Sequence, residues 1–268
     1  MDILKKIKSK IGSSLKSDII FPENKSLSKI LGPYKKAYVL GSSPTIGKLN
    51  LKIIDIDTLI ISMGNFHEHP DIQKIKPHVH IFAASHEPLT DSVITNWWSR
   101  SNEKLPKETL VLVENRDQLI AEKTFVNREL KRYSYGGTYP VDFQKKIVTP
   151  WSVTQVAIQL CIYLKIPETY LLGVTHDWQS CKPYEHFFKS SEPSLEFYMH
   201  REGIKTRNEQ LKQPMPKEKM YRSYELYQGY EKLKLQAEEQ GLKIYNGDNF
   251  SSFDVFEKRV LKELILEN

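Results

Sequence analysis

The sequence predicts an α/β fold of the Rossmann-like type, in which a mostly parallel central sheet is flanked by helices. Short runs rich in β-branched and aromatic residues alternate with longer mixed segments, as strands alternate with crossover helices in a parallel sheet. The stretch AYVLGSSPTIGKL, residues 37–49, has the form of one such unit: a buried strand, a small-residue turn and an amphipathic segment. With 268 residues, 40% of them hydrophobic, the chain can form one main domain.

Six segments have the composition of strands and two have that of long helices. The predicted strands are residues 37–40, 58–62, 78–83, 109–113, 169–172 and 243–245. One helix is expected over residues 151–164, where Val153, Val156, Ala157, Leu160 and Leu164 line one face, and another over residues 217–240. Residues 179–216 are polar and too long for an ordinary connection, so we expect a mobile lid there.

The net charge of +6 is confined to the N-terminal segment. Residues 1–36 contain nine lysines and three acidic residues, and the rest of the chain is balanced. Ile3, Ile7, Ile11 and Leu15 recur every four residues among lysines, which predicts an amphipathic basic helix. Residues 1–16 can bind an anionic membrane surface, or the helix can pack on its own domain with a solvated lysine face. We expect residues 1–33 to form this extension and residues 34–268 to form the main domain.

Composition also bears on partners and compartment. The balanced remainder has no second basic stripe and no aromatic RNA-binding signature, which argues against nucleic acid. Cys161 and Cys181 have no CxxC spacing, and we find neither a secretory signal nor an apolar run of about 18 residues. We therefore expect a cytoplasmic protein that binds the inner face of the membrane at most peripherally. The sequence leaves the oligomeric state open, a homo-oligomer included.

Small and polar residues gather at the ends of three predicted strands. These ends are Gly41-Ser42-Ser43-Pro44-Thr45, Met63-Gly64-Asn65 and Gly173-Val174-Thr175-His176-Asp177-Trp178. In an open α/β sheet, ligands bind beyond the carboxyl ends of the strands, where such turns bring backbone N–H groups close to a phosphate. The first turn also fits ordinary turn chemistry, so the convergence of three strand ends is what predicts a ligand site.

The order of these motifs resembles that of a known family. Gly-Ser-Ser-Pro-Thr-Ile, residues 41–46, is similar to the Gly-Asn-Gly-Pro-Ser-Leu of the bacterial sialyltransferases of glycosyltransferase family 42, which also have an Asn where Asn65 ends the next strand. Residues 149–178, TPWSVTQVAIQLCIYLKIPETYLLGVTHDW, are similar to the family's Thr-Ser-Gly helix and the following strand. The related MptE-like group shares the Ser-Val helix start, the strand end of the His-Asp-Trp type, a later His-Phe and a C-terminal Ile-Tyr-Asn. The resemblance covers residues 36–260.

The resemblance implies a GT-A-like variant of the Rossmann fold that binds a CMP-activated sugar and transfers it without a metal, with a histidine base near the lid. The donor-binding positions it implies are Gly41, Ser42, Ser43, Pro44, Asn65, His86, Thr149, Ser152, Thr154, Gly173, Thr175 and His176. Ser152 stands where an N-cap residue belongs, and the N-terminus of a helix favours an anion.

The sequence departs from the family at positions that bear on the donor. The family's Asn in the first turn is Ser42, and its Asp after the third strand-end glycine is Thr175. Of two tyrosines that assist the leaving phosphate, one corresponds to Tyr184 and the other to Trp178 or Asp177. Because Trp cannot usefully give up a proton at neutral pH, the identity of the donor sugar stays open.

Two histidines are candidates for the catalytic base. His186, in Lys-Pro-Tyr-Glu-His-Phe-Phe, matches the His-Phe of the MptE-like group, and His200 within the lid is the alternative. A histidine with a pKa near 6.5 can accept the proton of an acceptor hydroxyl at neutral pH, and Glu185 or Asp177 could orient the ring. The other interpretation of His186 is a residue that packs the lid.

Other conspicuous side chains are interpreted structurally. Asp55-Ile56-Asp57 spells the DxD of metal-dependent glycosyltransferases, but it precedes the second strand and so lies at the opposite edge of the sheet. The pairs His67/His69 and His78/His80 lack a third ligand at a recognisable spacing, so we expect no metal and place these histidines at the surface or rim.

The tyrosines of the last long helix are expected to pack the core from one helix face; they are Tyr221, Tyr224, Tyr227 and Tyr230. The loop 133–139, with tyrosines beside glycines, is a candidate rim for the acceptor.

The main hypothesis is a glycosyltransferase of bacterial surface-polysaccharide or glycan assembly. It would transfer a sugar from a nucleotide-activated donor, CMP-linked for preference, to a glycan or lipid-linked acceptor with no further cofactor. The alternatives are a pterin diphosphokinase of the MptE-like sort, which would need ATP and Mg²⁺, and a nucleotide-binding module without activity. The basic N-terminal helix favours the transferase, because lipid-linked acceptors lie at a membrane and pterins do not.

Overall fold

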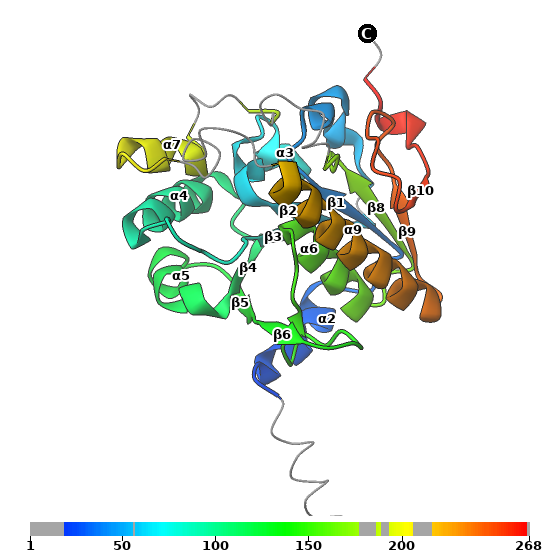
Figure 1. The fold of residues 1–268 in the computed structure, drawn as a ribbon, viewed down its shortest axis with the longest axis horizontal. Coiled ribbons are helices and arrows are strands. Elements are labelled where there is room, and N and C mark those ends of the chain that lie inside the picture. The colour runs from blue at the N-terminus through cyan, green and yellow to red at the C-terminus, as the bar shows by residue number, and fades with distance from the viewer. Residues whose placement is uncertain (1–18, 56, 177–185, 189–192, 206–215, 267–268) are drawn as a thin grey trace, which may run out of the picture.

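The chain forms an α/β fold around an eight-stranded parallel sheet (Figure 1). The computed structural model describes residues 19–55, 57–176, 186–188, 193–205 and 216–266. The strand order is β10-β9-β8-β1-β2-β3-β4-β5. The strands are β1 (Lys36–Leu40), β2 (Thr58–Met63), β3 (Val79–Ile81), β4 (Leu110–Glu114), β5 (Leu130–Tyr133), β8 (Glu168–Leu172), β9 (Lys243–Asn246) and β10 (Glu257–Lys258). The predicted fold class is confirmed.

Helices and short 3-10 turns connect these strands. The α-helices are α2 (Leu27–Ile30), α3 (Ile72–Ile75), α4 (Asp91–Lys104), α5 (Gln118–Thr124), α6 (Val153–Tyr163), α7 (Leu195–Arg201) and α9 (Pro216–Glu239). The 3-10 helices are η1 (Pro22–Ser26), η2 (Pro44–Lys48), η3 (Leu51–Ile53), η4 (Gly64–Glu68), η5 (Asn115–Asp117) and η6 (Lys262–Leu264). The two long helices expected from the sequence are α6 and α9. Of the predicted lid, residues 179–216, the structure describes residues 186–188, residues 193–205, which include α7, and Pro216 at the start of α9.

All six predicted strands are present, and their observed ends differ from the predicted ones by no more than two residues. The sequence did not reveal β5, β10 or a small second sheet of β6 (Tyr135–Gly137) and β7 (Ile147–Val148). The strand β5 reads Leu-Lys-Arg-Tyr, and β10 has only two residues, both charged. Neither has the run of β-branched residues that identifies the buried strands.

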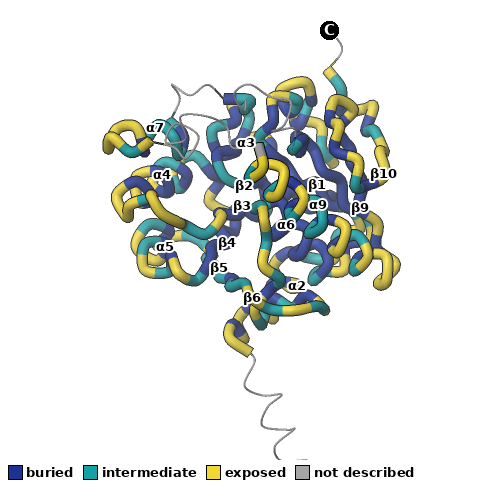
Figure 2. The backbone as a smooth tube through the Cα atoms, in the orientation of Figure 1, coloured by how far each residue is buried: buried dark blue, intermediate teal, exposed yellow. Residues whose placement is uncertain are grey.

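The central strands are buried because two hydrophobic layers cover the sheet (Figure 2). Successive side chains of a strand point to opposite faces, so Ala37 and Val39 of β1 join one layer while Tyr38 and Leu40 join the other. The first layer contains the apolar faces of α6 and α9, and the second contains those of α4 and α5. This two-sided burial explains why apolar residues predominate on both faces of the central strands.

The strand order reverses at β1. From β1 the chain adds β2 to β5 on one side, and it then returns to add β8, β9 and β10 on the other side. In open α/β sheets, a crevice for ligands forms beyond the carboxyl ends of the strands at such a switch point. Here these ends are Gly41 after β1 and Gly173 after β8, so the topology itself marks the first and third strand ends singled out in the sequence.

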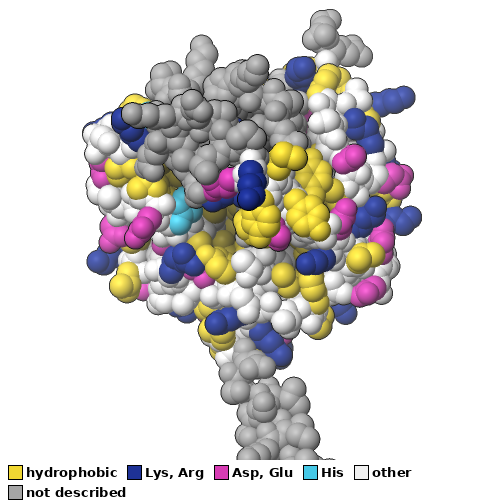
Figure 3. Space-filling model, in the orientation of Figure 1, with side chains coloured by type: hydrophobic (Ala, Val, Ile, Leu, Met, Phe, Trp, Pro, Cys, Tyr) yellow, Lys and Arg dark blue, Asp and Glu magenta, His cyan; other side chains and the backbone are white. Residues whose placement is uncertain are grey.

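The four tyrosines of α9 do not share a face as expected. Tyr230 is fully buried, whereas Tyr221 and Tyr224 are about 60% exposed. Each step of three residues turns the helix by about 300°, so three such steps rotate the series by about half a turn. Figure 3 shows hydrophobic side chains gathered on the surface near the start of α9, beside the region drawn in grey. The core-packing interpretation is therefore wrong for the first two tyrosines.

The predicted loop 133–139 is largely regular structure. Tyr133 ends β5, is 1% exposed and donates its hydroxyl hydrogen to the carbonyl of Phe82 at 2.9 Å. Tyr135 begins β6, where its hydroxyl accepts a hydrogen bond from Arg116. The expectation that Tyr133 belongs to an adaptable rim is therefore wrong, because its ring is packed in the core and its hydroxyl is hydrogen-bonded to the backbone.

The chain between residues 19 and 31 packs against the domain. Phe21 and Leu27 are buried. The amide of Asn24 donates to the carbonyls of Arg132 and Phe143, each at 2.7 Å, which ties η1 to β5 and to the loop before β7. The predicted basic helix over residues 1–16 lies outside the described residues.

Candidate functional site

The turn after β1 is built by small residues with defined roles. The side chain of Ser43 caps η2 by accepting from the backbone N–H of Thr45 at 3.4 Å, and Pro44 takes the first helical position, where no N–H is needed. Ser43 is buried, whereas Ser42 is half-buried and Pro44 is exposed. The side chains of this turn that are not buried are those of Ser42, Pro44 and Thr45.

The turns after β1 and β8 are locked together. The N–H of Gly41 donates to Leu172 at 2.8 Å and that of Ser43 to Gly173 at 3.0 Å. A Cβ at Gly41 would lie 2.3 Å from the Gly173 oxygen, so only glycine allows this approach. Asp248, which the sequence interpretation did not single out, accepts from the N–H of Gly173 at 3.2 Å and from the hydroxyl of Thr45.

His186 lies directly on the first turn. Its Nδ1 is 3.0 Å from the hydroxyl of Ser42, and the N–H of Phe187 donates to the Ser42 carbonyl at 3.0 Å. The imidazole stacks on Phe188, with ring centroids 4.6 Å apart. Burial lowers the pKa of His186, while the Glu196 carboxylate and the hydrogen bond at Ser42 oppose that shift. His200 is exposed near the end of α7.

Asn65 connects the end of β2 to α4 and α7. It is 8% exposed, and its Oδ1 accepts from Nε1 of Trp97 at 2.5 Å and from the N–H of Leu195 at 3.3 Å. Its Nδ2 lies 3.5 Å from Oε2 of Glu196. The side chain predicted to hold a phosphate therefore already meets a carboxylate. Glu196 was not identified from the sequence, because it lies in the polar segment interpreted as a lid.

The hydroxyl of Tyr230, in the middle of α9, connects the end of β8 to the start of α6. His176 has a left-handed backbone with φ of 48°, and its Nε2 is 2.6 Å from the hydroxyl of Tyr230. That hydroxyl is 2.8 Å from Oγ of Ser152. Ser152 occupies the predicted N-cap position, but its side chain does not cap α6. The hydroxyl bonds Tyr230 instead, so the predicted capping role of the side chain is wrong.

The remaining predicted donor positions differ in exposure. Thr154 and Thr175 are buried, and the hydroxyl of Thr154 lies 3.5 Å from the sulfur of Met63. Thr149 and His86 are exposed. Nδ1 of His86 lies 2.8 Å from the carbonyl of Glu87. The candidates Asp177, Trp178 and Tyr184, together with Glu185, lie outside the described residues.

The histidines expected at the surface or rim are mostly core residues. His67 and His80 are fully buried and His69 is 8% exposed, so that expectation is wrong for these three. Nδ1 of His67 and Nε2 of His80 each lie 3.0 Å from the carbonyl of Gly64, the residue before Asn65. Burial lowers the pKa of His67 to about 4 and lowers that of His80 well below its usual value. Two neutral imidazoles thus fix the turn that carries Asn65.

The acidic pair Asp55 and Asp57 precedes β2, at the opposite end of the strand from Asn65. Among the residues that the structure describes, no group of three or more His, Cys, Asp or Glu side chains could hold a metal ion. In that same part of the chain, none of the helices is both long and apolar enough to cross a membrane.

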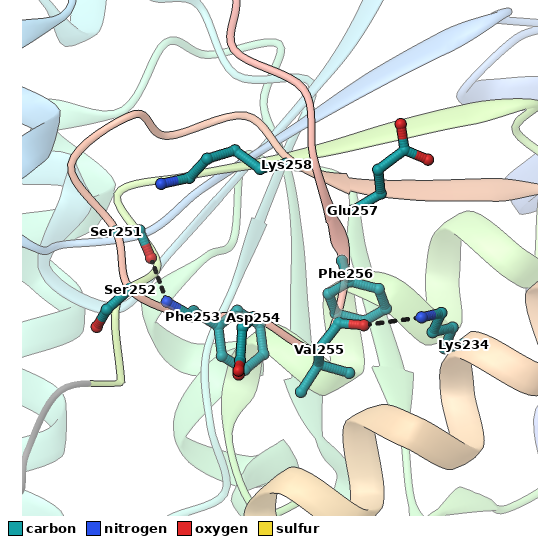
Figure 4. A pocket seen from close by; sticks show the side chains of 9 residues that line it. All are labelled: Lys234, Ser251, Ser252, Phe253, Asp254, Val255, Phe256, Glu257 and Lys258. Carbon is teal, nitrogen blue, oxygen red and sulfur yellow. Dashed lines mark hydrogen bonds between the residues drawn. The ribbon is translucent and has the colours of Figure 1, made fainter.

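A hollow lies beside the turn that follows β8. Its volume is about 480 Å³ and it is lined by Lys234 and residues 251–258 (Figure 4). Both lysines donate to backbone carbonyls, Lys234 to Val255 at 3.0 Å and Lys258 to Asn249 at 3.2 Å. The hydroxyl of Ser251 donates to the Val174 carbonyl at 2.8 Å, so one wall of this hollow supports the turn after β8.

Comparisons with known proteins show where else this fold occurs. No protein-family model matches the chain, and no curated protein matches it. The structure of the monofunctional alpha-2,3-sialyltransferase Cst-I from Campylobacter jejuni is similar, with a TM-score of 0.53 and 12% identity over 88% of this chain and 83% of that one. The sialyltransferase CST-II in complex with trisaccharide acceptor and CMP matches with a TM-score of 0.50 and 11% identity, over 87% of this chain and 89% of that one. The chain therefore has the α/β fold of these sialyltransferases.

Proposed function

We propose that the protein is a glycosyltransferase that uses a CMP-activated sugar as donor, with His186 as general base and no metal. The donor would bind at the switch point of the sheet, between the turns after β1, β2 and β8. Solved sialyltransferases with this fold supply the donor class, since one of them is in complex with CMP. Glycan or lipid-linked acceptors, and a role in bacterial surface-polysaccharide or glycan assembly, belong to the same proposal.

The contact between Ser42 and His186 carries the proposal. The two residues are 144 positions apart in sequence, and each was assigned to the site on separate grounds. Their 3.0 Å hydrogen bond supports a single site in which the base meets the donor turn. Because burial lowers the pKa of His186 below 6.5, the imidazole is neutral at pH 7 and can accept a proton.

The reaction would be a single in-line displacement at the anomeric carbon. The acceptor oxygen forms its bond to that carbon while the bond to the phosphate oxygen breaks and CMP leaves with the electron pair. His186 takes the hydroxyl proton of the acceptor. If Nδ1 donates to Ser42, the lone pair of the neutral ring is on Nε2, which is then the nitrogen that accepts the proton. Tyr184 and Trp178 or Asp177 remain the candidates for assisting the leaving phosphate.

The proposal includes binding to a membrane through the basic N-terminal segment. Residues 1–16 would lie on an anionic membrane surface and hold the domain next to a lipid-linked acceptor. The five lysines of this segment, each contributing on the order of 1 kcal/mol near such a surface, support that location.

A thermal-shift screen combined with a transfer assay tests the function. CMP and CMP-sugars should raise the melting temperature, with and without EDTA, because a ligand present at 100 times its Kd stabilises the folded state by about 2.7 kcal/mol. Transfer from a CMP-sugar to a glycan acceptor should be detectable by mass spectrometry. Stabilisation by ATP with Mg²⁺ alone would instead indicate the diphosphokinase, and no response to any nucleotide would indicate the inactive module.

Two alanine variants assign the base within that assay. His186→Ala should keep nearly full affinity for CMP and lose about 10²–10⁴-fold in turnover. His200→Ala is the matched control on α7 and should keep its turnover. The opposite pattern would move the role of base to His200.

A further inference from the structure

The carboxylate of Glu196 is held at the candidate site by α7. Ser194 caps this helix by accepting from the N–H of Phe197 at 3.2 Å, and the adjacent N–H of Leu195 donates to Asn65. These bonds place Glu196 in the first turn of α7, with Oε2 3.5 Å from Nδ2 of Asn65. Glu196 therefore faces the ends of the strands and not the solvent side of the helix.

His186 and Glu196 are brought together by neighbouring strands. His186 is bonded to Ser42 after β1, and Glu196 is bonded to Asn65 after β2. These strands pair in parallel, with Leu40 opposite Ser62, so the two turns leave the sheet side by side at about the 4.8 Å spacing of adjacent strands. The Glu196 charge consequently acts on the imidazole and raises the pKa of His186 against the effect of burial.

Two basic side chains of α4 form ion pairs with Glu68 and not with Glu196. Arg100 and Lys104 of α4 lie 2.7 and 4.0 Å from the carboxylate of Glu68. Among the described residues, no Lys or Arg lies within 4.0 Å of the Glu196 carboxylate, whose hydrogen-bond partner there is the Asn65 amide. A carboxylate in this position can stabilise an imidazolium that forms transiently beside it.

We propose that Glu196 is a positioning residue for His186, holding the imidazole in its productive state and stabilising the imidazolium formed when His186 accepts the acceptor proton. The part of this proposal that concerns catalysis rests on the proposed function, in which His186 is the general base. The interaction between Glu196 and His186 belongs to the free protein and can be measured without a substrate.

The first test is an NMR titration of His186 in the free full-length protein. His186→Ala assigns the signal, and Glu196→Gln should move the titration of that imidazole to lower pH, because it removes the charge that raises its pKa. Glu196→Asp keeps the charge and should restore much of the shift. Glu202→Gln is the matched control, since Glu202 follows the same helix and accepts from the Thr90 hydroxyl at 2.6 Å. An unchanged titration in Glu196→Gln would overturn the proposal.

The second test is the pH dependence of transfer. In Glu196→Gln, the acid limb of kcat/KM should move to lower pH, and turnover at pH 7 should fall by about 10–100-fold with little change in KM for the donor. A purely structural role would lower turnover at all pH values without moving the limb, and that result would also overturn the proposal. If no CMP-sugar is transferred at all, the proposed function fails, while the NMR titration still decides whether Glu196 acts on His186.

Discussion

At the scale of single residues, the candidate site depends on side chains kept neutral by burial. His67 and His80 each donate one N–H to the Gly64 carbonyl, and burial keeps both rings neutral, because protonation would place a charge in a space closed to water. Gly64 has φ of 56°, a conformation suited to glycine, so both the residue type and the two imidazoles fix the path of the chain into Asn65. The geometry of the site and the acid stability of the protein are thus connected.

His67 should make the protein sensitive to acid. Its pKa is lowered from 6.5 to about 4 in the folded state, so the unfolded chain binds the proton first as the pH falls. Its contribution to the free energy of unfolding is complete above pH 6.5 and decreases toward pH 4, by about 3 kcal/mol at 1.36 kcal/mol per pH unit. Urea unfolding at several pH values measures this slope.

Two substitutions separate His67 from other titrating groups. His67→Asn keeps a donor near the position of Nδ1 but cannot titrate, so its stability should depend less steeply on pH between 6.5 and 4. His86→Asn changes an exposed histidine and should leave the slope as it is in the unaltered protein. Equal slopes in all three proteins would contradict the assignment.

At the scale of elements, the site is a set of strand-end turns that support one another. The turn after β1 contacts that after β8 through backbone bonds, Asp248 joins both, and Tyr230 joins β8 to α6. Such a set is more rigid than any one of its turns. Of these turns, the one after β1 is the most sensitive to substitution at Gly41. The backbone of Gly173 there occupies the space that a larger side chain would need.

Gly41→Ala should destabilise the fold and the site together. The added Cβ would lie 2.3 Å from the Gly173 oxygen, so the two turns must separate at a cost of about 1–3 kcal/mol. Gly47→Ala in the adjoining helix η2 is the control, because nothing lies within 4 Å of its added Cβ, and its effect should stay within about 0.5 kcal/mol. Urea unfolding measures both. Equal stability of the two variants would show that the turns are not locked as described.

Much of this element-level arrangement could be predicted from the sequence. Apolar runs and small-residue turns located the central strands, and the three strand ends pointed to one edge of the sheet. What periodicity could not supply was the burial of individual side chains: a spacing of three residues suggested one face for Tyr221 to Tyr230, and alternate histidines suggested a rim. The partners Asp248 and Glu196 were missed because their roles depend on contacts across 75 and 131 positions of sequence.

At the scale of the whole molecule, the excess positive charge is concentrated at the N-terminal end of the chain. The excess of lysines lies before residue 37, whereas residues 37–268 are balanced in charge. Burial of Phe21 and the bonds of Asn24 make the chain from about residue 20 part of the domain. A deletion that leaves the fold intact should therefore end at residue 18.

Deleting residues 1–18 should abolish binding to anionic vesicles. Five lysines are lost, and at about 1 kcal/mol for each the partition coefficient should fall by about 10³–10⁴-fold. Cosedimentation with vesicles containing phosphatidylserine measures this, and vesicles of phosphatidylcholine alone give the background. The melting temperature should stay the same, because Phe21 and Asn24 are retained. Undiminished sedimentation of the shortened protein would rule out this segment as the anchor.

The position of β1 between β2 and β8 has a consequence for biosynthesis. The ribosome completes β1 to β5 long before Glu168 begins β8, so a nascent chain has one flank of β1 without its neighbour. An apolar strand with unpaired N–H and C=O groups is a template for aggregation. Chaperones that shield this flank until the last third of the chain emerges would thus protect the same strand that later carries the Ser42 turn of the candidate site.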